Sequence, residues 1–214
     1  MSAVFLSASS GLLAQDPAPG AVITFQFERA GLAVPRFELK IAQDGTGSYD
    51  ADAVFLPVAG TPAPAPQHIA RSVTISKATV VRIFGGARAL NWFNTDCGTA
   101  LKNVADMGTK TLRYTGPGGQ GACSYNYTDS PRVEDVTKAF QAIAVTLDCG
   151  RKLDFDHRFD RLGLDADINI LVEAVADGRA IELGTIASTL RSLTRDPDVL
   201  ERVRVRQDSS LARL

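Results

Sequence analysis

The segment that decides the fold is PRVEDVTKAFQAIAVTLDCGRKL, residues 131–153. Two apolar stripes recur along it at helical spacing. The first stripe consists of Val133, Val136, Phe140, Ile143 and Leu147, and the second of Ala142, Val145, Cys149 and Leu153. A helix that is apolar on two faces is usually packed between two other elements. We therefore predict a central helix over about 131–153, with a sheet on one side and C-terminal helices on the other.

Each stripe has an expected partner. Phe140 and Leu147 should pack on the strands, through the side chains Phe25, Phe27, Phe37 and Leu39. Val145 and Leu153 should contact the C-terminal helices, through residues such as Leu171, Ile186 or Leu190.

Upstream of this helix the chain reads as antiparallel strands. Residues 22–28 and 36–42 alternate apolar and polar side chains, which is typical of half-buried strands. The pair Asp44-Gly45 is a strong turn signal, and a third strand follows over 47–55. A fourth strand is expected over 69–75, followed by a helix capped by Ser76. A hairpin over 109–128 turns at GPGGQ.

Downstream of Gly163 the pattern is mostly helical, with helices expected over 165–176, over 180–194 and from Asp196 onward. The predicted fold class is α+β: an antiparallel meander sheet packed on a long central helix, with a C-terminal helical extension. We expect a signal peptide at 1–15, a sheet-plus-helix domain at 16–150 and a helical extension at 151–214 that packs on the same core.

Composition excludes several classes of protein. The 214 residues carry 23 basic and 24 acidic side chains, a net charge of -1, and 45% of them are hydrophobic. This balance does not favour a nucleic-acid binder. Arg202, Arg204 and Arg206 could form a basic contact, but Asp198, Glu201 and Asp208 dilute it. No apolar run reaches the 18 or so residues of a membrane span, so no integral membrane segment is predicted.

The N-terminus resembles a secretory signal. An apolar run, AVFLSASSGLLA at 3–14, precedes the polar, Pro-rich QDPAPG at 15–20. We expect processing near Ala14 or Gln15 and a periplasmic or extracellular location. Two features oppose this: the first basic residue is Arg29, and Leu12 would occupy the -3 position. The alternative is an N-terminus that frays or docks on the core.

The cysteines Cys97, Cys123 and Cys149 fit no zinc-binding spacing. In an oxidising compartment we expect Cys97 and Cys123 to form a disulfide, with Cys149 left as a free thiol. Sequence alone leaves the other two pairings open.

The densest polar cluster contains Asp154, Asp156, His157 and Asp160. On a helix, His157 and Asp160 are i,i+3 neighbours, and Asp156 and Asp160 are i,i+4 neighbours, an arrangement that can hold a divalent metal. The i,i+4 pair of Lys152 with Asp156 favours instead a solvated face with salt bridges. We predict no metal and no cofactor, and keep Asp156, His157 and Asp160 as the candidates for a site.

Other motifs carry little chemistry. Cys149 and His157 lie about 12 Å apart along one helix, too far for a nucleophile and its base. The Gly-rich GPGGQG at 116–121 leads into a strand, so it is a hairpin turn and not a phosphate loop. Asn126-Tyr127-Thr128 fits a glycosylation sequon, a match that is frequent by chance.

Several features resemble a family of small α+β domains of unknown function found in exported bacterial proteins. They are the opening FQFER strand at 25–29, the DGTGSY strand at 44–49, the aromatic pair Trp92 and Phe93 that ends the capped helix, and the late hairpin before a helix. The resemblance implies export and an α+β fold, and no activity.

Two functions follow from this sequence. The first is an exported, non-catalytic module that binds a protein or a small ligand. The second is a cell-envelope hydrolase, which would need Asp156, His157 and Asp160 to converge in a cleft. A concave pocket formed by carboxylates and a histidine would favour the hydrolase, and an exposed aromatic patch would favour the binding module.

Overall fold

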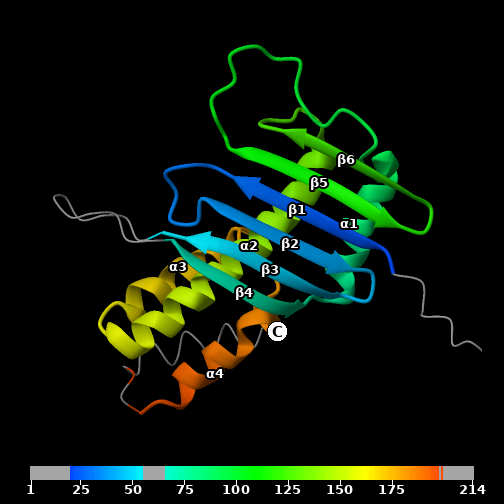
Figure 1. Cartoon of the computed structure of the whole chain (residues 1–214). Helices are drawn as coiled ribbons and strands as arrows, with labels where there is room; N and C mark the ends of the chain where they lie inside the picture. The colour runs from blue at the N-terminus through cyan, green and yellow to red at the C-terminus, as the bar shows by residue number, and fades with distance from the viewer. Residues whose placement is uncertain (1–19, 55–65, 198, 200–214) are drawn as a thin grey trace, which may run out of the picture.

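The structure is a computed structural model that describes residues 20–54, 66–197 and 199. Within these ranges six strands form one sheet: β1 (Val22–Glu28), β2 (Arg36–Ala42), β3 (Thr46–Ala53), β4 (Gln67–Thr74), β5 (Thr109–Gly116) and β6 (Gly119–Tyr125). The helices of the same ranges are α1 (Lys77–Ala89), α2 (Pro131–Phe159), α3 (Leu164–Ala176) and α4 (Ala187–Arg195), with the short 3-10 helices η1 (Asn91–Phe93) and η2 (Leu183–Ile186) (Figure 1). The expected signal peptide at 1–15 and the arginines at 202, 204 and 206 lie outside the described residues.

The sheet is antiparallel throughout, in the order β4-β3-β2-β1-β5-β6. The first four strands form a meander, and the β5–β6 hairpin joins it beside β1. The predicted α+β class, with its antiparallel sheet and C-terminal helices, is confirmed. The hairpin is tighter than expected, because Gly116 pairs with Gly119 and leaves only Pro117 and Gly118 in the turn.

One face of the sheet is apolar and covered, and the other is polar. On β1, Ile23, Phe25 and Phe27 are buried, and their neighbours point to the opposite face. α1 and α2 lie across the apolar face (Figure 1). The polar face carries hydrogen-bonded side chains such as Gln26, whose Nε2 donates to Glu38 at 2.5 Å.

α2 begins where the sequence predicts. The side chain of Ser130 accepts a hydrogen bond from the Val133 N–H at 3.4 Å, and Pro131 occupies the first turn, where a missing N–H costs nothing. The helix ends at Phe159, later than the predicted end near Leu153.

The first apolar stripe of α2 packs on the sheet, as expected. The rings of Phe140 and Phe25 stack with their centroids 5.2 Å apart, and both side chains are fully buried. Leu147 belongs to the same hydrophobic cluster as Phe37 and Leu39. We call this group the sheet cluster.

The second stripe packs on the C-terminal segment as predicted, except at Val145. Leu153 packs with Leu171, Ile186 and Leu190, as expected. Val145 does not, and its side chain is 37% exposed, so this part of the prediction is wrong.

The face of α2 that meets the C-terminal segment combines Ala142 and Leu153 of the predicted stripe with Thr146 and Gly150. The Thr146 hydroxyl donates to the Ile181 carbonyl at 2.6 Å. A Cβ on Gly150 would lie 2.3 Å from Ile186 Cγ2, so only glycine allows this close approach.

Buried apolar side chains of the C-terminal segment form a second group, the helix cluster, which contains Leu153, Ile168 and Leu193 among others. The described residues form two clusters, and Ile181 of the C-terminal segment packs against the sheet cluster, so the expectation of one shared core stays a prediction. The expected boundary at residue 150 falls inside α2, which contributes side chains to both clusters.

Glu182 ties the C-terminal segment to α1. Its carboxylate accepts hydrogen bonds from the Ser76 N–H at 2.8 Å, from the Ser76 hydroxyl at 2.6 Å and from the Thr79 hydroxyl. Ser76 is the predicted cap of α1, and a carboxylate at a helix N-terminus is favoured by the helix dipole. Glu182 itself has a φ of +61° and lies immediately before η2, so the helix expected over 180–194 begins only after it, as η2 followed by α4.

We predict that Phe140→Ala lowers the free energy of unfolding by about 3–5 kcal/mol, because it removes a fully buried ring and leaves a cavity against Phe25. Urea denaturation followed by circular dichroism would measure the loss. Val81→Ala is the control, since Val81 on α1 is 58% exposed and should change stability by less than about 0.5 kcal/mol. Similar losses in both variants would show that the stacking contact does not hold α2 on the sheet.

Candidate ligand-binding groove

The structure gives the three predicted site residues different surroundings. Asp156 is buried between α2 and α3. The Nε2 atom of His157 lies 2.6 Å from Asp196 Oδ2. Asp160 caps the end of α2, and its Oδ1 accepts a hydrogen bond from the Gly163 N–H at 3.2 Å. Within the described ranges no group of three His, Cys, Asp or Glu side chains could hold a metal ion.

Asp156 forms a buried carboxyl pair with Asp167 beneath Lys152. The two aspartates are 5% and 6% exposed. Lys152 Nζ lies 3.2 Å from Asp156 Oδ2 and also binds Asp167. Burial, followed by the hydrogen bond with Asp167, raises the pKa of Asp156 from 3.8 to about 6. The expected solvated face is therefore wrong for Asp156, because α3 covers it.

A groove with a volume of about 730 Å³ lies between the sheet and α2. On the sheet side it is lined by Phe27, Phe37 and Tyr49, with Leu32 and Val34 from the loop between β1 and β2. On the helix side it is lined by one face of α2, by Ile170 of α3 and by residues 177–179 after α3.

Helical spacing explains the α2 side of the groove. Lys138, Gln141, Val145 and Asp148 follow one another at intervals of three or four residues, so they lie on the same face of the helix. α3 packs along α2 through the helix cluster and exposes Ile170, which is 52% accessible. The lining is therefore apolar at its base, with charged side chains at its edge.

The charged side chains of the lining balance one another. Two are cationic and two are anionic, and each lies in an ion pair. The pairs are Lys138 with Glu134 at 2.8 Å, Asp148 with Arg151 at 2.7 Å, and Asp177 with Arg179 at 3.0 Å. The groove thus has no net charge.

Two other titratable groups line the groove, and both are protonated at neutral pH. Burial, and then the Asp148 carboxylate, raises the pKa of the Cys149 thiol to about 11. The same two causes raise the pKa of the Tyr49 phenol. Neither of the two histidines of the chain lines the groove: His68 lies beside Asp52 on the polar face of the sheet, and His157 binds Asp196.

The sequence did not single out the groove. Val145 was expected under the C-terminal helices, and Tyr49 appeared only as the end of a strand motif. The available signal was the mixed character of the α2 face that carries Lys138, Gln141, Val145 and Asp148, since a face packed under other helices would be more uniformly apolar.

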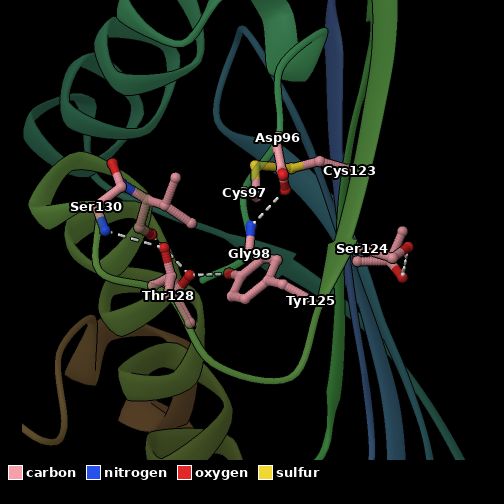
Figure 2. The surroundings of a disulfide bond; sticks show 11 residues. Asp96, Cys97, Gly98, Cys123, Ser124, Tyr125, Thr128 and Ser130 are labelled. Atoms are coloured by element: carbon pink, nitrogen blue, oxygen red, sulfur yellow. Dashed lines mark hydrogen bonds between the residues drawn. A yellow bond between two sulfur atoms is a disulfide. The ribbon is translucent and has the colours of Figure 1, made fainter. Parts of the chain in front are cut away.

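The described chain contains the disulfide expected between Cys97 and Cys123, with Cα atoms 5.8 Å apart, and Cys149 is a free cysteine. Figure 2 shows this bond joining the loop after η1 to β6. Cys123 and Tyr125 lie on the same side of β6, and Ser124 points to the other side (Figure 2). The bond fastens the loop to β6, an edge strand of the sheet.

Comparisons with known proteins identify no relative. No protein-family model matches the chain, and no curated protein matches its sequence. The resemblance to an exported α+β family therefore stays a prediction. A separate property of the described part of the chain is that none of its helices is both long and apolar enough to cross a membrane.

We predict that alkylation of Cys149 by N-ethylmaleimide accelerates with pH up to about 11, because only the thiolate reacts and burial raises the pKa of this thiol. Mass spectrometry would give the rate at each pH, over the range in which circular dichroism shows an intact fold. Cys149→Ala is the control and should incorporate no label. A rate that levels off near pH 9 would contradict the shifted pKa.

We predict that Asp156→Asn gains stability relative to the wild type as the pH rises from 4 to 7. The pKa of Asp156 is higher in the folded chain than in the unfolded chain, so the stability that its protonation confers is present at low pH and is lost as the pH passes about 6. Asparagine does not titrate and removes this loss. Urea denaturation at several pH values would measure the difference, with Asp154→Asn as the control. A difference that stays constant with pH would refute the prediction.

Proposed function

We propose that the protein is an exported, non-catalytic binding module that holds an apolar ligand in the groove between the sheet and α2. The observation that carries this proposal is the groove itself. Its volume of about 730 Å³ lies within the range of about 300–1,000 Å³ that is usual for small-molecule sites. Such sites combine an apolar lining with a few polar groups, as this groove does.

The chemistry of the lining supports binding without catalysis. A nucleophile needs a lowered pKa or an adjacent base. Burial raises the pKa of Cys149 and of Tyr49, which makes both groups less reactive at neutral pH. Neither histidine lines the groove to act as their base.

Export is supported by two independent features. The Cys97–Cys123 disulfide suits an oxidising compartment. The apolar run at 3–14 followed by QDPAPG suits a secretory signal. The resemblance of the first 150 residues to an exported α+β family points to the same periplasmic or extracellular location.

The proposal is tested with a neutral apolar dye, 1-N-phenylnaphthylamine, whose fluorescence rises in an apolar site. We expect the wild-type protein to bind the dye and Val145→Arg to bind it at least about 10-fold more weakly, because a charged side chain would enter the groove. Val145 is 37% exposed, so an arginine there can leave the core intact.

Val81→Arg is the matched control, since Val81 is an exposed valine of α1 outside the groove lining. It should bind the dye as the wild type does. Absence of binding by the wild type, or equal binding by the two arginine variants, would reject the groove as the site.

A further inference from the structure

Tyr49 carries a buried hydroxyl group that finds no partner within the described residues. Its side chain is 3% exposed, and its ring packs on Phe37 with centroids 5.9 Å apart. No protein group in the described ranges forms a hydrogen bond with this hydroxyl. Buried polar groups are satisfied in the great majority of cases, so an exception calls for an explanation.

The side chain that carries this hydroxyl belongs to the lining of the groove. Tyr49 and Asp148 both line it, and the Asp148 carboxylate is close enough to raise the pKa of the phenol. The phenol is therefore neutral and offers an O–H donor. Arg151, at 2.7 Å, already pairs with the Asp148 carboxylate. A ligand in the groove is then the natural acceptor.

The charged side chains of the lining further limit the class of ligand that the groove can bind. Every charged side chain of the described lining forms an ion pair with a neighbouring residue; these side chains are Lys138, Asp148, Asp177 and Arg179. The described lining therefore has no unpaired charge that would bind an ion. A charged ligand would have to leave water without a matching charge, which is costly. A ligand without net charge avoids this desolvation penalty.

The size of the exposed apolar surface favours a small molecule over a protein. Val145 and Ile170 are the large exposed apolar side chains of the described lining. A stable protein interface covers about 800 Å² on each partner, far more than two side chains offer. Of the remaining apolar lining, Phe27 and Phe37 are buried and Leu32 and Val34 are half-buried.

We infer, on the basis of the proposed function, that the ligand is a neutral amphipathic small molecule with an oxygen acceptor such as an ester, amide or alcohol. The acceptor receives a hydrogen bond from the Tyr49 hydroxyl, and the apolar part lies against Phe27, Phe37 and Val145. Tyr49 is the residue that distinguishes an oxygen-bearing ligand from a pure hydrocarbon.

The test is displacement of 1-N-phenylnaphthylamine by methyl octanoate, octanoate and octane from the wild type and from Tyr49→Phe. We expect Tyr49→Phe to lower the affinity for methyl octanoate about 3- to 10-fold, which is the range for one lost hydrogen bond. The affinity for octane should be unchanged. Octanoate should bind more weakly than its ester in the wild type.

Tyr125→Phe is the matched control, because the Tyr125 hydroxyl is bonded to Thr137 and does not line the groove. It should leave the affinity for methyl octanoate unchanged. Thermal melts of both variants establish that they are folded.

The outcomes separate the two proposals. If the wild type binds no dye, the proposed function fails. If the dye binds and Tyr49→Phe affects ester and octane alike, the role of Tyr49 is overturned while the binding function stands. Displacement by octanoate as strong as that by the ester would overturn the neutral character of the ligand.

Discussion

The stacking of Phe140 on Phe25 is the contact on which the rest of the structure depends. Phe25 lies on β1, which has β2 on one side and β5 on the other, so the contact joins α2 to the middle of the sheet. Both rings are fully buried, and aromatic stacking adds to the free energy of burial. Once α2 is fixed here, its orientation determines which side chains face the C-terminal helices and which face solvent.

The groove is a consequence of that orientation. α2 buries one face on the sheet and another, through Thr146, Gly150 and Leu153, against the C-terminal segment. A third face, which carries Val145, is left between them. Exposed apolar surface is unfavourable in water, and a ligand that covers it would stabilise the folded chain by an amount that grows with the logarithm of its concentration relative to Kd. Under the proposed function, ligand binding in the groove would therefore depend on the contact that holds α2 in place.

The elements with strong local patterns could be predicted from the sequence, and the features that depend on rotation or on distant segments could not. Ser130 and Pro131 predicted the start of α2, and Phe25 and Phe140 predicted its packing. Val145 was misplaced because Thr146 and Gly150, which make the contact, are not counted as apolar. A shift of one residue rotates the face by about 100°. The groove is formed by strands, α2 and α3 together. A local sequence pattern does not show which distant segments come into contact, so the groove could not be predicted.

The free thiol of Cys149 has to be reconciled with the proposed export. Disulfide exchange and oxidation proceed through the thiolate, so a thiol that stays protonated reacts slowly even in an oxidising compartment. Burial and the neighbouring Asp148 carboxylate keep Cys149 protonated at neutral pH. Because the other two cysteines of the chain are bonded to each other, Cys149 has no cysteine within the chain with which to form a disulfide. The burial that Cys149 has in the groove lining therefore also protects this free cysteine from oxidation.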